Sequence, residues 1–160
     1  MKPSDVQTDI LAAVTTLGLS PEQFRQLPDT EAEQVCRTAL GRFVTCSFNP
    51  SWWWEHLREP KAGFQPDGIP GFDIIPRLVP DGDAPIYFVA EDDSDSFFPV
   101  YLTTTRIAAS VIAECFSFEF YLLPTDFSWL VGENHHDVVF GSGEPIVQAI
   151  NAHSNATESA

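Results

Sequence analysis

The stretch GENHHDVVFG, residues 132–141, carries the side chains of this sequence that are best suited to acid–base or metal chemistry. Five consecutive residues have ionisable or amide groups: Glu133, Asn134, His135, His136 and Asp137. On an extended backbone, alternation would place Glu133, His135 and Asp137 on one face. Two carboxylates and an imidazole could begin a divalent-metal site, or His135 could act as a base oriented by a carboxylate.

The alternative interpretation of the same stretch is a polar turn between two apolar runs. Gly132 and short polar side chains are typical of turns, where they satisfy neighbouring backbone groups. Zinc sites usually draw His or Cys ligands from elsewhere, and the only other histidines are His56 and His153. We therefore expect a structural turn and no metal or cofactor, and we keep four residues as candidate catalytic groups: Glu133, His135, His136 and Asp137. The fold could bring Glu119 or His56 near them.

Three consecutive tryptophans form the second chemically distinctive feature. Successive residues on a helix differ by about 100°, so at least one ring of Trp52, Trp53 and Trp54 is expected outside the core. An exposed Trp favours an interface anchor, whereas the alternative is a helix buried between two layers.

The net charge of −15 is unevenly distributed. Six acidic residues and no basic one lie between Arg77 and Arg106, and seven acidic residues and no basic one follow Arg106. Such a surface repels nucleic-acid phosphates and anionic lipids, so neither is expected as a partner. It would attract a basic protein, although acidity can also serve solubility alone. The predicted interaction residues are Trp52, Trp53, Trp54, Glu55, Glu91, Asp92, Asp93 and Asp95.

The elements that must position these residues follow from capping and periodicity. Helices are predicted at residues 4–17, 20–27 and 30–40, where capping residues precede apolar residues at helical spacing. Strands are predicted at residues 42–48, 72–80, 86–92, 98–102 and 115–124, with one or two more within 127–141. Further helices are predicted from Asn49, at residues 103–115 and at residues 145–150, and residues 59–71 form a loop.

These elements predict an α+β fold, with N-terminal helices packed on a mainly antiparallel sheet that one helix interrupts. We expect a single domain at residues 1–150 and a polar, frayed tail at residues 151–160. Three widely spaced cysteines are typical of reduced thiols, and no apolar run approaches the ~18 residues of a membrane span. The protein is thus expected in the cytoplasm, as a monomer or homodimer.

Two segments resemble a family of small bacterial proteins of uncharacterised function. SWWWEHL and FYLLPTDFSWLVGENHHDVVFGSG contain a WWWE segment and a W-L-x-x-E-N-H-H-D segment that mark this family. Its general architecture is similar to α+β proteins of the immunity class, including the Smi1/Knr4-like superfamily. The resemblance implies no catalytic residue. The uneven negative charge and the tryptophan cluster favour a non-enzymatic, immunity-type domain that binds a basic protein. The alternative is a metal-dependent or His-assisted hydrolase that uses the cluster from Glu133 to Asp137.

Overall fold

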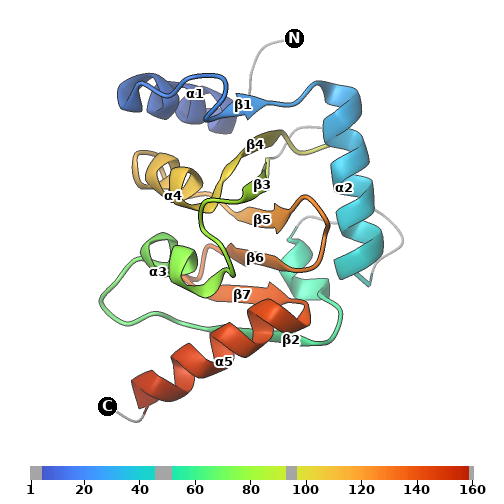
Figure 1. The fold of residues 1–160 in the computed structure, drawn as a ribbon, viewed down its shortest axis with the longest axis vertical. Helices are drawn as coiled ribbons and strands as arrows, with labels where there is room; N and C mark the ends of the chain where they lie inside the picture. The colour runs from blue at the N-terminus through green and yellow to red at the C-terminus, as the bar shows by residue number, and fades with distance from the viewer. Residues whose placement is uncertain (1–4, 46–51, 93–96, 159–160) are drawn as a thin grey trace.

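The computed structural model of the chain describes residues 5–45, 52–92 and 97–158. Within these residues, the strands form a seven-stranded antiparallel sheet in the order β1-β4-β3-β5-β6-β7-β2, which runs from top to bottom in Figure 1. The strands are β1 (Arg25–Gln26), β2 (Lys61–Phe64), β3 (Pro85–Ala90), β4 (Val100–Thr104), β5 (Phe120–Pro124), β6 (Leu130–Glu133) and β7 (Val139–Ser142). The helices are α1 (Asp5–Leu17), α2 (Asp29–Phe43), the 3₁₀ helix η1 (Trp53–His56), α3 (Gly71–Leu78), α4 (Thr105–Ala113) and α5 (Glu144–Glu158). The predicted α+β fold class is confirmed.

Helices cover both faces of the sheet, so the central strands are apolar on both sides. On one face, α1, α3, α4 and α5 pack against alternate strand residues such as Phe88, Phe120 and Val131. On the other face, α2 and η1 pack against Tyr121 and Leu123. This arrangement explains why FYLLP reads as a continuous apolar run, which is typical of a strand buried on both faces.

The predicted strand at residues 72–80 is wrong, because this segment forms helix α3. Ile74, Ile75 and Leu78 lie at helical spacing and are buried in the core that contains α4 and α5. Pro76 lies inside the helix and removes one backbone donor. Burial of the apolar side of α3 outweighs this cost. The sheet is therefore interrupted by α3 as well as by α4.

Several predicted boundaries also differ from the structure. Residues 20–27 do not form the predicted helix but a turn followed by β1. Helix α2 continues through Gly41, its predicted stop, to Phe43. Strand β2 lies within the predicted loop 59–71. Strand β5 begins only at Phe120, and Phe116 is 81% exposed. Helix α5 continues to Glu158, past the predicted end at Ile150.

Other predicted elements are confirmed, or lie outside the described residues. Strands β3 and β4 and helix α4 occur where they were predicted, and the Thr104 side chain caps α4 by accepting a hydrogen bond from the backbone N–H of Ile107 at 3.3 Å. The predicted helix starts at Ser4 and Asn49 lie outside the described residues. Within the described ranges, no helix has the length and apolar character that a bilayer span requires.

The surroundings of Gly132 show how closely the central strands pack. A Cβ at this position would lie 2.7 Å from Cζ of Phe140 and closer still to the backbone oxygen of Phe120. Because the neighbouring backbone cannot move aside easily, Gly132→Ala should lower the free energy of unfolding by about 2 kcal/mol or more. Urea denaturation measures this change.

The matched control is Gly41→Ala in the interior of α2, where the added methyl group has no neighbour within 4 Å. Its better helix propensity should raise the free energy of unfolding by about 1 kcal/mol. Equal effects of the two substitutions would contradict the packing described for β5, β6 and β7.

Candidate functional site

Three glutamates lie at the same end of the central strands. Glu91 follows β3, Glu119 precedes β5 and Glu133 ends β6, and the register pairs Phe120 with both Ala90 and Glu133. The backbone N–H of Glu91 donates to the carbonyl of Glu119 at 2.9 Å. Strand alternation places Glu91 and Glu119 on the face covered by α2 and η1, whereas Glu133 lies on the face covered by α3 and α4.

The Glu119 carboxylate is buried and receives hydrogen bonds from two distant segments. Its side chain is only 8% exposed. The indole N–H of Trp54 donates to Oε2 at 3.1 Å, and the backbone N–H of His135 donates to Oε1 at 3.2 Å. The imidazole Nδ1 of His135 also contacts Oε1. These donors compensate the carboxylate for the water that it loses on burial.

Glu91 and Glu119 form a hydrogen-bonded carboxyl pair. Burial, followed by the hydrogen bond to Glu119, raises the pKa of Glu91 from the ordinary value of 4.5 to about 9. Burial alone would also raise the pKa of Glu119, but the hydrogen bonds from Glu91, His135 and Trp54 lower it overall. One proton is therefore held on Glu91 at neutral pH and donated to the charged Glu119. Glu91 also accepts hydrogen bonds from the Trp52 backbone N–H and, at 3.5 Å, from the Tyr121 hydroxyl.

Aromatic rings cover this carboxyl pair on the outside, and we call Trp52, Trp54, His135 and His136 the Trp–His patch. The ring of Trp52 lies 5.5 Å from that of His135 and 6.4 Å from that of Trp54. Trp54 lies 5.9 Å from His136. Trp52 is 45% exposed, and its φ of +59° places its backbone in the left-handed region. Trp53, in contrast, is completely buried and stacks on Tyr121 at 4.7 Å.

The ENHHD cluster forms a turn between β6 and β7, and not an extended face. The Asn134 side-chain oxygen accepts hydrogen bonds from the backbone N–H groups of His136 at 2.9 Å and Val138 at 3.2 Å. Asp137 has a φ of +59°. The turn sends His135 toward Glu119, whereas Glu133 and Asp137 line a cavity on the opposite face. The single face of Glu133, His135 and Asp137 that an extended backbone would give is therefore not formed.

The remaining predicted residues occupy different places. Glu55 is exposed on η1, and Asp92 is half-buried next to Glu91. Asp93 and Asp95 lie outside the described residues. Among the residues that the structure describes, no group of three or more His, Cys, Asp or Glu side chains is placed to hold a metal ion.

Sequence reasoning missed the pairing of Glu91 with Glu119 and the role of Tyr121. Glu119 was named only as a residue that the fold could bring near the histidines, and it does contact His135. The available signal was the alternation of FEFY, in which Glu119 shares a face with the aromatic Tyr121. Leu123 lies on the same face, and two large apolar side chains next to the acid indicate that this face is also covered.

The chain belongs to the family of unknown function DUF6756, whose model matches residues 2–154. No curated protein matches the chain.

The carboxyl pair predicts a specific dependence of stability on pH. Because the folded state raises the pKa of Glu91, it holds a proton that the unfolded state releases, and the free energy of unfolding should fall between pH 4.5 and about 9. Glu91→Gln keeps a donor to Glu119 and an acceptor for Trp52, so its decline over this range should be smaller. Urea denaturation at several pH values measures both declines.

Glu22→Gln, an exposed change in the turn before β1, is the control and should follow the wild-type pH profile. Burial also raises the pKa of Glu133, which contributes a decline of the same sign in every variant. If Glu91→Gln declined as steeply as the wild type, the proton assignment would be wrong.

Proposed function

We propose that this member of the DUF6756 family is a cytoplasmic, non-enzymatic interaction domain that binds a basic protein partner through the Trp–His patch. The observation that carries the proposal is the exposed Trp52 ring, which packs near Trp54 and His135 beside a buried, charged carboxylate. Exposed aromatic rings next to negative charge are the chemistry that recognises a cation.

The patch suits the guanidinium group of an arginine in particular. A guanidinium can stack on the face of a Trp ring, and the negative charge of Glu119 beneath the rings attracts it without direct contact. The Trp54 and His135 rings are already held in place by the Glu119 carboxylate, so the patch needs little rearrangement on binding. The net charge of −15 would speed the approach of a basic partner.

The two segments that resemble a bacterial family of uncharacterised function both contribute to this surface. The WWWE segment contributes Trp52 and Trp54 to the patch, and the W-L-x-x-E-N-H-H-D segment contributes His135 and His136. The two segments that mark the resemblance thus meet at one surface. In this proposal the protein binds and neutralises a basic toxin or another cationic protein. A homodimer contact through the same rings is the competing use of the surface, and light scattering of the purified protein distinguishes it.

The test compares capture of partners by variants that differ in one exposed apolar residue. Trp52→Ala removes the exposed ring without changing charge, and it should weaken binding of a captured basic protein by about thirty-fold, as for an interface hot spot. Leu11→Ala, at a residue 66% exposed on α1, is the matched control and should bind like the wild type. Affinity is measured by calorimetry with the purified captured protein.

Binding should also weaken as salt is added, because screening reduces attraction between exposed charges. Captured proteins that are acidic, or that bind the wild type and Trp52→Ala equally, would refute the proposal.

A second candidate function is a His-assisted hydrolase, which the contact between His135 and Glu119 favours. With Nδ1–H directed at the carboxylate, Nε2 of the neutral ring presents a lone pair that can take a proton from water. The protonated Glu91 would act as the neighbouring acid. The His135 side chain is 47% exposed, so a substrate can reach it.

The hydrolase hypothesis predicts that the protein hydrolyses esters and that this activity requires both His135 and Glu119. His135→Asn and Glu119→Gln should each reduce the rate with p-nitrophenyl acetate by about a hundred-fold, the scale of general base catalysis. His153→Asn, on the opposite side of the sheet beside Phe64, should leave the rate unchanged. Equal rates for all three variants would exclude a hydrolase site at His135 and would not affect the interaction proposal.

A further inference from the structure

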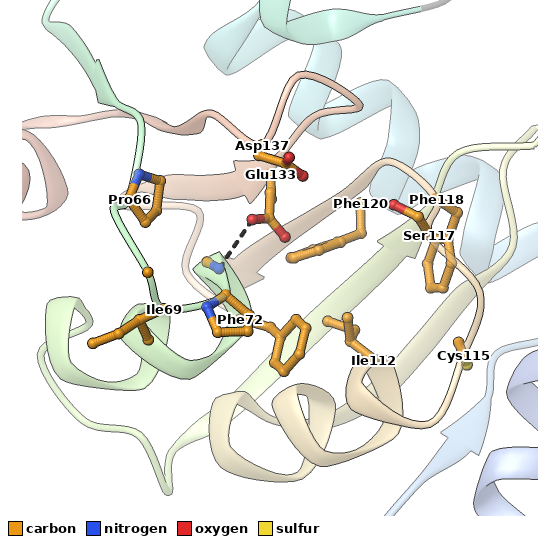
Figure 2. Close-up of a pocket in the computed structure, with 13 residues that line it drawn as sticks. Pro66, Ile69, Phe72, Ile112, Cys115, Ser117, Phe118, Phe120, Glu133 and Asp137 are labelled. Atoms are coloured by element: carbon orange, nitrogen blue, oxygen red, sulfur yellow. Dashed lines mark hydrogen bonds between the residues drawn. The ribbon is translucent and has the colours of Figure 1, made fainter.

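A cavity of about 460 Å³ lies on the face of the sheet opposite to the Trp–His patch. Its residues come from the loop before α3, the start of α3, the end of α4 and the loop after it, the adjoining ends of β5 and β6, and the β6–β7 turn, as Figure 2 shows. The volume lies within the range of about 300–1,000 Å³ that is typical of small-molecule sites.

The walls of the cavity divide into an apolar part and an acidic part. Phe72, Ile112 and Phe120 form the apolar part, and Glu133 and Asp137 approach from the other side (Figure 2). All residues that line the cavity belong to the described part of the chain, and none of them is a Lys, Arg or His. The cavity thus combines rings with negative charge and contains no positive side chain to neutralise it.

The Glu133 carboxylate is held in place by the first residue of α3. The backbone N–H of Gly71 donates to Oε2 at 3.1 Å, drawn as the dashed line in Figure 2. A Cβ at position 71 would overlap this carboxylate and would lie 2.8 Å from the Val139 side chain. Glycine at the start of α3 therefore lets the carboxylate approach the backbone closely.

We propose that this cavity binds a small organic ammonium ion with an aromatic or branched apolar body. The ammonium group contacts Glu133 and Asp137, and the apolar body packs against Phe72, Ile112 and Phe120. The site is independent of the Trp–His patch, because its walls lie on the other face of the sheet.

Binding of such a cation is linked to the protonation of Glu133. Burial raises the pKa of Glu133, and the negative charge of Asp137 raises it further, whereas the Gly71 N–H opposes the shift. A bound cation favours the charged carboxylate, so it promotes loss of the proton. The affinity for an ammonium ion should therefore increase as the pH rises from acidic to neutral values.

The test uses three probes with closely similar skeletons and different charge: 2-phenylethylammonium, 2-phenylethanol and 3-phenylpropionate. Calorimetry should show that the ammonium ion binds at least about ten-fold more tightly than the alcohol, and that the carboxylate binds least. Equal affinity for all three probes, or no binding of the ammonium ion, would overturn the proposal.

Variants and chemical shifts then locate the bound amine. Glu133→Gln should weaken binding of 2-phenylethylammonium about ten-fold or more. Asp73→Asn, an exposed acid on α3 that does not line the cavity, is the control and should bind like the wild type. Asp137→Asn is a second variant, because Asn tolerates the positive φ and its fold should be preserved, and it should also weaken binding.

In an NMR titration, amide shifts should concentrate at Gly71, Phe72 and Glu133. Shifts concentrated at the indole N–H groups of Trp52 and Trp54 would place the amine in the Trp–His patch and overturn the assignment. Unchanged affinity for 2-phenylethylammonium in both Glu133→Gln and Asp137→Asn would also overturn the assignment.

Discussion

The burial of one charged carboxylate, that of Glu119, is the constraint on which the arrangement of the site depends. This group can be buried only if donors replace the water that it loses. The donors come from η1 through Trp54, from the β6–β7 turn through His135, and from the end of β3 through Glu91. The carboxylate therefore fixes three segments that are far apart in the sequence, and their aromatic side chains come together as a consequence.

The fold could be predicted from the sequence where local signals agree with packing. The capped helix α4 and strands β3 and β4 have clear periodicity, and they occur as predicted. Residues 72–80 could not be assigned from local signals, because FDIIPRLVP fits a buried strand and a buried helix equally and Pro76 argues against both interiors. The choice of α3 depends on the core formed with α4 and α5, which is a long-range property.

The candidate site was predictable only in part, for the same physical reason. The ENHHD cluster is visible in the sequence, and a turn was the expected structure there. The division of its side chains between two faces depends on the register of β6 with β5 and β7, together with the hydrogen bonds that Asn134 accepts. Sequence spacing contains no information about a proton held between Glu91 and Glu119, because those residues meet only through the pairing of β3 with β5.

The shared proton also determines what the Trp–His patch presents to a ligand. Burial and then the hydrogen bond to Glu119 raise the pKa of Glu91, and the repulsion between two charged carboxylates raises it further. Only one negative charge remains, and it is held on Glu119 with its oxygens directed by Trp54 and His135. A single fixed charge beneath exposed rings discriminates by geometry as well as by charge, because a cation must lie against the rings to come close to that charge. The excess of acids elsewhere on the chain has no such geometric requirement, so it can attract many basic proteins, whereas the patch can select among them.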